Sequence, residues 1–418
     1  MALICESGQF TAPATNQEQT VTLNNFTGVT PKVVILSWSR VLANGISTEC
    51  ALGTGVGISS TEEGSVYFVA RNNQATTITA SSKGVHCFRD VDNDGAEQTQ
   101  ASFTSFGDNQ FTITWDGASA PVSQLVNYFV IGGDDLTDVS LLEFATPVTT
   151  GNEAYTGVGF QPDAIFFLNS VLTNEGDTGV AGGYIGYGAT DGVNQAALGV
   201  STLDNVAASL VNQLQLTSAC IALPHNNGTL YQASIVSLDS DGFTVNYSVV
   251  NAAARRCFAL CLKGGQYHVG SGDSQTTAGT QGYTGTGFTP VGALFFNAAS
   301  AASASVLQDL HVNFGSSSGA TQNTCSLGTD EDAQDTSDCD RAMSITKCVK
   351  MIDHAQAVIA EADLDSFDSD GFTFDWTTAD ATARQFLYLA MGSEEAVVAV
   401  DEDDDLIIGG GLFNEFMI

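Results

Sequence analysis

The sequence predicts an all-β protein: three tandem, homologous, jelly-roll-like β-sandwich modules followed by a short C-terminal tail. Two sequence motifs each recur three times at one common period, which indicates that a single module was triplicated. Apolar runs of strand length recur between turn residues, and helical periodicity is nearly absent. Many short strands separated by regular turns are typical of a β-sandwich.

The opening motif of each module is a Gly- and Pro-containing turn that leads into an apolar strand. It reads YTGVGFQPDAIFFLNS from Tyr155 and YTGTGFTPVGALFFNAAS from Tyr283, and a reduced form, FTGVTPKVVILSWS, begins at Phe26. The prolines of the three copies are spaced by 131 and 128 residues: Pro31, Pro162 and Pro290. A continuous apolar run between turns predicts a buried strand.

The closing motif joins an alternating strand to an almost continuous apolar strand. It reads DSDGFTVNYSVVNAAARRCFALCLKGG from Asp239 and DSDGFTFDWTTADATARQFLYLAMG from Asp368, and a weaker copy begins at Gly107. Aromatic and aliphatic residues two positions apart share one face of a strand, so this face is expected to pack in the core. The predicted core residues are Trp115, Phe243, Tyr247, Phe372 and Trp376. Stacking on a sugar is the alternative for the tryptophans, but their register with apolar neighbours favours core packing.

The period near 130 residues is the size of a domain rather than of a solenoid repeat. We therefore expect module 1 at residues 1–136 as a divergent copy, module 2 at 137–266, module 3 at 267–394, and a tail at 395–418. The boundaries fall at Gly132-Gly133, Gly264-Gly265 and Gly392-Ser393, where glycine lets the chain turn. Arg256 and Arg384 precede the last strand of modules 2 and 3, where module 1 has Gln124, and we expect them to bond backbone carbonyls.

Charge narrows the set of partners. The chain has 12 basic and 47 acidic residues, a formal net charge of −35. Such a surface repels nucleic acids and anionic membranes, so we expect neither as a partner. No apolar stretch approaches the ~18–20 residues of a membrane span, and the N-terminal residues lack the pattern of a signal peptide.

The nine cysteines are odd in number, and we expect them not to recur at equivalent positions of the modules. This argues against a disulfide framework and predicts synthesis in a reducing cytoplasm. The five histidines are scattered, and no nucleophile elbow, phosphate loop or zinc motif occurs. We therefore expect no enzymatic activity and no cofactor.

One acidic stretch, RDVDNDGAEQ, suggests a calcium site. Asp90, Asp92 and Asp94 followed by Gly95 match the first half of a calcium-binding loop of the EF-hand type. The twelfth loop position is Ala101 instead of the usual bidentate glutamate. A solvated hairpin turn is the favoured interpretation, and Ca²⁺ coordination is the alternative.

The tail combines an acidic run, a three-glycine hinge and an apolar end. Leu412, Phe413, Phe416 and Met417 fall at a spacing that suits one face of a short helix or hook. Such a segment is too short to fold alone, so we expect it to dock, either on the modules or on a partner.

The opening and closing motifs together resemble the repeated modules of virion structural proteins from tailed bacteriophages. The resemblance covers roughly 40 residues at the two ends of each module, and module 1 departs from it by lacking Gly-Phe before Pro31 and Asp-Gly before Phe111. It implies a jelly-roll-like virion module and transfers no active-site residues.

Three functions remain open at this point. The first is a capsid decoration or head-fibre protein on the virion surface, which contacts other virion proteins and can form homo-oligomers. The second is a tail fibre or adhesin that recognises a host surface glycan. The third and least favoured is a polysaccharide-degrading enzyme, which would need paired carboxylates in a deep cleft.

Overall fold

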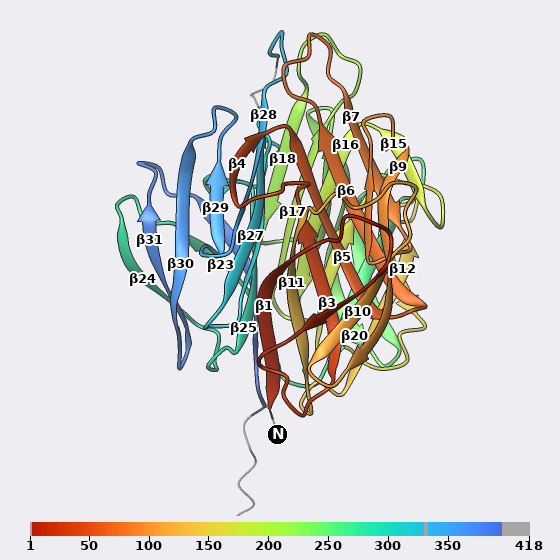
Figure 1. The fold of residues 1–418 in the computed structure, drawn as a ribbon. Helices are drawn as coiled ribbons and strands as arrows, with labels where there is room; N and C mark the ends of the chain where they lie inside the picture. Colours follow the sequence, from red (N-terminus) through yellow and green to blue (C-terminus); the bar gives the residue numbers. More distant parts are fainter. Residues whose placement is uncertain (1, 330–332, 395–418) are drawn as a thin grey trace, which may run out of the picture.

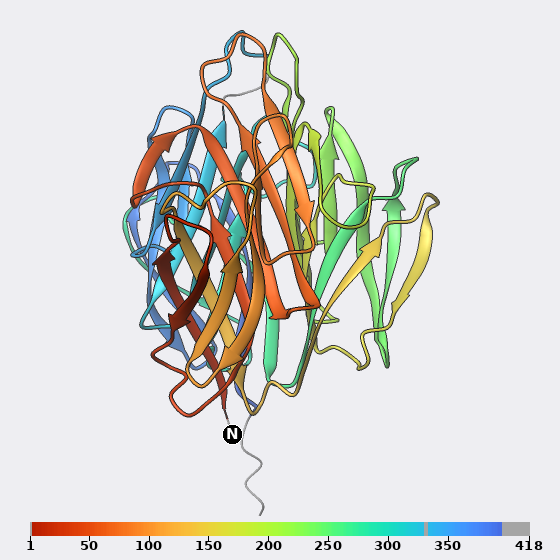
Figure 2. The same ribbon diagram turned by 45° about the vertical axis from the view of Figure 1, so that its right-hand side comes forward.

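The computed structural model describes residues 2–329 and 333–394 and confirms the all-β prediction. This part of the chain consists of β-strands, turns and loops, and it contains no helix. Accordingly, it contains no long apolar helix of the kind that crosses a membrane. The strands run roughly along the long axis of the molecule (Figures 1 and 2).

The strands are as follows. In module 1 they are β1 (Leu3–Thr11), β2 (Glu18–Thr22), β3 (Pro31–Trp38), β4 (Gly45–Thr48), β5 (Cys50–Ser59), β6 (Glu62–Ala70), β7 (Thr79–Gly84), β8 (Phe88–Val91), β9 (Glu97–Gly107), β10 (Gln110–Trp115) and β11 (Leu125–Gly133). In module 2 they are β12 (Asp138–Ala145), β13 (Gly151–Thr156), β14 (Ala164–Asn169), β15 (Thr178–Ala181), β16 (Gly183–Thr190), β17 (Gln195–Thr202), β18 (Val211–Leu216), β19 (Ile221–His225), β20 (Gly228–Asp239), β21 (Gly242–Val249) and β22 (Arg256–Lys263). In module 3 they are β23 (Gln266–Asp273), β24 (Gly279–Thr284), β25 (Gly292–Asn297), β26 (His311–Ser317), β27 (Gln322–Thr329), β28 (Cys339–Ser344), β29 (Val349–Ile352), β30 (Val358–Asp368), β31 (Gly371–Thr378) and β32 (Gln385–Gly392).

Each module forms two antiparallel sheets, and the strand order is the same in all three. The larger sheet, which we call the inner sheet, has the order β1-β11-β3-β5-β6-β7, β12-β22-β14-β16-β17-β18 or β23-β32-β25-β26-β27-β28. The four-stranded sheet, which we call the outer sheet, has the order β2-β10-β9-β8, β13-β21-β20-β19 or β24-β31-β30-β29. Four strands of each inner sheet form a meander: β3-β5-β6-β7, β14-β16-β17-β18 and β25-β26-β27-β28. The short strands β4 and β15 come between the first two strands of the meander in modules 1 and 2.

The inner sheets are buried on both faces, which explains their continuous apolar sequences. In β3, Val34 and Leu36 face the outer sheet of module 1, whereas Val33 and Ile35 belong to a cluster shared with the other modules. A strand that alternates between two buried faces needs apolar residues at every position. The outer sheets have one face toward solvent and accordingly alternate, as in β21.

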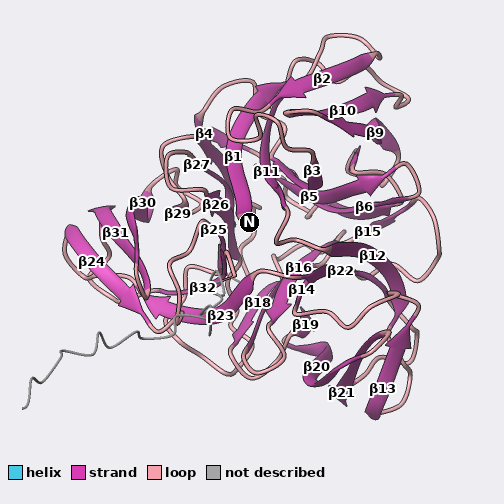
Figure 3. Ribbon diagram, turned by 90° about the horizontal axis from the view of Figure 1, so that it is seen from below, coloured by secondary structure: helices cyan, strands magenta, loops and turns pink. Residues whose placement is uncertain are grey.

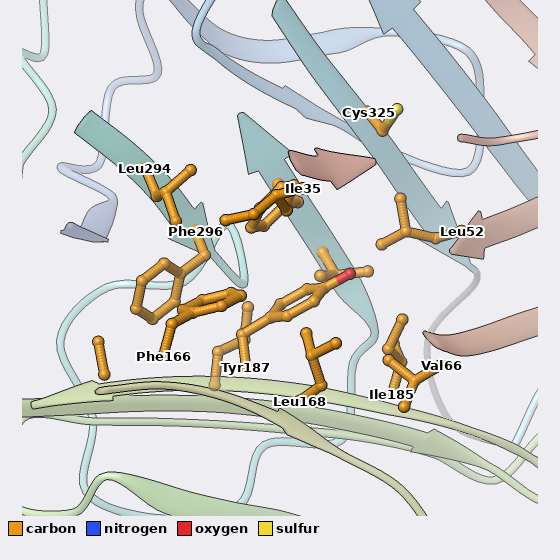
Figure 4. Close-up of a cluster of buried hydrophobic side chains, with 14 of the residues drawn as sticks. Ile35, Leu52, Val66, Phe166, Leu168, Ile185, Tyr187, Leu294, Phe296 and Cys325 are labelled. Carbon is orange, nitrogen blue, oxygen red and sulfur yellow. The ribbon is translucent and has the colours of Figure 1, made fainter. Parts of the chain in front are cut away.

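The three inner sheets surround one central core, and the outer sheets lie at the periphery (Figure 3). Tyr187 of module 2 lies in this core among residues of modules 1 and 3 (Figure 4). Its hydroxyl is 2.8 Å from Thr54 Oγ1 of module 1, and its ring centroid is 5.0 Å from that of Phe314 of module 3. The modules therefore share a hydrophobic core in addition to the core within each sandwich.

Strand additions link the modules in a ring. The loop after the third strand of each module pairs with the edge of the inner sheet of another module: β15 pairs with β7, and β4 pairs with β28. The third contact is a bridge in which Leu307 and Gln213 exchange backbone hydrogen bonds of 3.0 and 2.9 Å. The edge-strand residue of each pair occupies the same position in its module. The pairs are Ser81 with Val180, Gln213 with Leu307, and Arg341 with Ser47. Because each module contacts the next in the same way, the single chain forms a closed, pseudo-threefold ring.

The expectation that cysteines do not recur at equivalent positions is wrong for three of them. Cys87, Cys220 and Cys348 occupy the same place in the three modules, where each thiol donates to an alanine carbonyl: Ala101, Ala233 and Ala362. A glycine of the inner sheet lies against each cysteine carbonyl: Gly55, Gly188 and Gly315. All nine cysteines lie within the described residues, and all are buried and free of disulfides.

Candidate functional site

The five predicted core residues are buried within the sandwiches. Trp115, Phe243, Tyr247, Phe372 and Trp376 are each at most 1% exposed. The indole nitrogen of Trp115 donates to Gln19 Oε1 at 2.9 Å, and that of Trp376 donates to the Tyr283 hydroxyl at 3.0 Å. These rings have no exposed face on which a sugar could stack.

The acidic stretch at Asp90 forms the hairpin turn between β8 and β9. Asp92 Oδ1 accepts hydrogen bonds from the backbone N–H groups of Asp94 and Ala96, at 3.0 and 2.9 Å, and Asp94 is exposed. Asp90 is instead buried, where its carboxylate accepts from Thr99 N–H at 2.7 Å and lies 3.4 Å from Arg40 Nε. The three carboxylates therefore lie in different surroundings instead of converging on one point. Among the described residues, no group of three or more His, Cys, Asp or Glu side chains is placed to hold a metal ion.

Burial raises the pKa of Asp90 to about 6, although the charge of Arg40 and the hydrogen bond from Thr99 oppose this shift. The pair that Asp90 forms with Arg40 thus ties the acidic hairpin to the loop after β3. This contact is what the sequence pattern of alternating aspartates could not indicate.

The arginine that precedes the last strand is Arg255 in module 2, and the prediction of Arg256 is off by one residue. Arg255 Nη1 donates to the Val171 carbonyl at 2.5 Å, as Arg384 Nη1 donates to the Ala299 carbonyl at 2.9 Å. The predicted bonding of a backbone carbonyl is confirmed for Arg384, whereas in module 2 Arg255 makes this bond instead of Arg256. Arg256 is half-buried and pairs with Glu175.

The four apolar tail residues, Leu412, Phe413, Phe416 and Met417, lie outside the described residues. Their docking role stays a prediction from sequence.

Polar contacts reinforce the junction between modules 1 and 2. Lys83 is fully buried in β7, where its ammonium lies 2.8 Å from Glu143 Oε1 and 5.1 Å from the Phe258 ring centroid. At the same junction His86 Nε2 lies 2.9 Å from Asp177 Oδ2. Burial lowers the pKa of His86, but the hydrogen bond and charge of Asp177, together with the charges of Glu63 and Asp116, outweigh burial, so the net shift is upward. These are structural ion pairs between modules.

A cavity of about 650 Å³ lies where the loop of module 1 that contains β4 meets β28 of module 3. Its walls include the side chains of Arg40, Arg71 and Arg341, together with Glu49 and Asn93. Leu42, Ala43 and Asn44, on the β4 loop, are exposed, so the cavity opens to solvent there. A cavity of this volume falls within the range of small-molecule binding sites.

Sequence patterns do not reveal this group of arginines, because its members are far apart in sequence and belong to two modules. The one indication in the sequence is that arginine is scarce. The chain contains seven arginines, and three of them line this cavity. A smaller cavity of about 290 Å³ lies beneath the corresponding loop of module 2, lined in part by Tyr184, His225 and Arg255.

No protein-family model matches this chain, and no curated protein matches it at a significant level.

Proposed function

We propose that this chain is a non-enzymatic structural protein of a tailed-phage virion, displayed on the capsid surface as a decoration or head-fibre protein. The observation that carries the proposal is the closed pseudo-threefold ring, in which three sandwiches share one core. An icosahedral shell has threefold axes, and a body with three nearly equivalent faces can contact three neighbouring capsid subunits at such an axis.

We infer that 1–136, 137–266 and 267–394 are three copies of one jelly-roll-like sandwich. The first strand pairs with the last in the inner sheet, and the second pairs with the second-to-last in the outer sheet, as in β1–β11 and β2–β10. Strand pairs from the two ends of the module thus lie alternately in one sheet and in the other. A long hairpin that is rolled up into two sheets has this arrangement, which is that of a jelly roll.

The ring also bears on oligomeric state. In a homotrimer of single sandwiches, each subunit would cover the inner face of its neighbours. Here the three modules of one chain cover these faces for each other, since residues of all three contribute to the central core. The proposed partners are therefore other virion proteins rather than further copies of the chain at this face.

A tail fibre or adhesin that recognises a host surface glycan is the second candidate. The solvent-open cavity with three arginines favours it, because a cavity of this kind can hold an acidic ligand.

A binding comparison tests both candidates. Labelled full-length protein would be incubated with phage heads that lack it and, separately, with host cells, each with and without a calcium chelator. Saturable binding to heads alone supports the decoration role. Saturable binding to cells alone overturns it in favour of the adhesin, and a chelator-sensitive signal would restore the Asp90, Asp92 and Asp94 calcium hypothesis. Binding to neither target overturns both candidates.

The tail gives a second test. Removal of residues 401–418 is expected to leave the three modules folded but to abolish assembly onto the particle, as measured by co-sedimentation with heads. Unchanged incorporation of the truncated chain would contradict the docking role of Leu412, Phe413, Phe416 and Met417.

A further inference from the structure

The cavity between modules 1 and 3 concentrates positive charge in a strongly acidic chain. Its lining contains three arginines and one glutamate, whereas the whole chain has a formal net charge of −35. Arg40 lies 3.4 Å from Asp90, but in the described part of the chain no carboxylate lies within 4.0 Å of Arg71 or Arg341. Two of the three guanidinium groups therefore have no ion-pair partner there.

Arg341 has a particular need for a counter-charge. It lies in β28, where its Nε is 3.3 Å from Ser47 Oγ. Burial lowers the pKa of Arg341, and the nearby charge of Arg40 lowers it further, although Tyr67, Cys50 and Glu49 act in the opposite direction. An arginine stays protonated in a protein, so its charge persists in this unfavourable setting. An anion in the cavity would stabilise it.

The rim of the cavity offers apolar contact as well as charge. Leu42 and Val122 both line it, and their side chains are 66% and 61% exposed. The volume of about 650 Å³ is several times that of a simple inorganic anion. The lining therefore suits a ligand that carries an oxyanion on a larger, uncharged body.

The backbone around the cavity is held in unfavourable conformations. Arg40, Glu49 and Val122 have φ values of 54°, 77° and 42°, in the left-handed region. This region is uncommon for non-glycine residues and especially unfavourable for a β-branched one. Strained residues cluster at ligand-binding sites, where the surrounding structure holds them in place.

The other two junctions of the ring provide an internal comparison. The position of Arg341 is occupied by Ser81 in module 1 and by Gln213 in module 2. The position of Arg40 is occupied by Val171 in module 2 and by Ala299 in module 3. The equivalence follows from the residue after each of them, because its carbonyl accepts a hydrogen bond from the N–H group at the start of the last strand in all three modules. The shared fold therefore does not require these arginines. Their presence at one junction out of three points to a function specific to that junction.

We propose that this cavity binds an organic oxyanion, a carboxylate or phosphate ester attached to an uncharged body. The guanidinium groups of Arg40, Arg71 and Arg341 bind the oxyanion, because guanidinium matches the planar geometry of carboxylate and phosphate oxygens. Leu42 and Val122 contact the body. This proposal does not rest on the decoration role, and it concerns the same cavity that favours the adhesin candidate.

The test is a calorimetric titration of the full chain with three probes: glucuronate, glucose 6-phosphate and glucose. We expect one or both anions to bind and glucose not to bind. A carboxylate-only or phosphate-only result identifies the oxyanion. Failure of both anions, or equal binding of glucose, overturns the proposal.

Variants then locate the site. We expect Arg341→Gln and Arg71→Gln each to weaken binding about tenfold or more, since each removes a charge-assisted hydrogen bond. Arg71 is exposed, so its substitution does not threaten folding. Arg256→Gln is the matched control, because Arg256 pairs with Glu175 and does not line the cavity. Binding by Arg71→Gln that equals binding by Arg256→Gln would place the ligand elsewhere.

Discussion

At the scale of single residues, Asp90 shows how burial decides the chemistry of a side chain. Its neighbours Asp92 and Asp94 lie in a hairpin turn, whereas Asp90 is fully buried beside Arg40. Burial raises its pKa to about 6 from an ordinary value of 3.8. A carboxyl group that is easier to protonate in the folded state stabilises the fold more at low pH.

The sign of this effect leads to a pH prediction. The contribution of Asp90 is fully present below pH ~4 and is lost as the pH rises through about 6. Relative to an Asp90→Asn variant, the native chain should therefore lose about 3 kcal/mol of unfolding free energy between about pH 3 and about pH 7. Urea denaturation of both proteins across this range measures the difference. A difference that does not change with pH would contradict the raised pKa.

At the scale of elements, the two sheets of each sandwich are in direct contact at a glycine of the inner sheet. A Cβ added to Gly188 of β16 would lie 1.8 Å from the Cys220 carbonyl oxygen, just before β19. The equivalent distances at Gly55 and Gly315 are both 1.9 Å. A side chain at any of these positions would push the outer sheet away from the inner one.

Gly188→Ala is therefore expected to reduce the free energy of unfolding by about 1–3 kcal/mol, the range for overpacking. Gly282→Ala on β24 is the matched control, because its added Cβ would meet its nearest neighbour at an ordinary 3.5 Å. Chemical denaturation of the two variants gives the comparison. Equal stability of both variants would show that the sheets can separate at no cost.

At the scale of the whole molecule, the shared core predicts that the modules unfold together. Tyr187 contacts residues of both other modules, so no module can unfold without exposing apolar surface of the others. We expect calorimetry to show one cooperative transition for the described part of the chain. Three separate transitions would contradict the shared core.

Substitution of Tyr187 provides a sharper version of this test. Tyr187→Ala should lower the stability of the whole molecule by about 3–5 kcal/mol, the range for removal of a buried aromatic ring. Tyr187→Phe removes only the hydroxyl that contacts Thr54 and should cost about 1 kcal/mol. Val193→Ala is the control, since Val193 is 86% exposed and its loss should change stability by less than about 0.5 kcal/mol.

Local sequence patterns determined the elements of this protein. The alternation through Phe372, Phe374 and Trp376 appears as β31, and the continuous apolar run of FLYLAM appears as β32, because strand formation depends on residues two positions apart. The period of the motifs likewise corresponds to a strand order that repeats three times. The spacing of Cys87, Cys220 and Cys348 carried the same information, but a cysteine count alone did not reveal it.

Tertiary structure alone decided how the three modules meet. The same apolar strand could have faced a central core, a partner or a second chain, since a buried face does not specify what covers it. Pairing of β4 with β28 brings Arg341 into the same cavity as Arg40, about 300 residues away in sequence. Side chains so distant in sequence share no local pattern, so the cavity and its charge arise only when the ring closes.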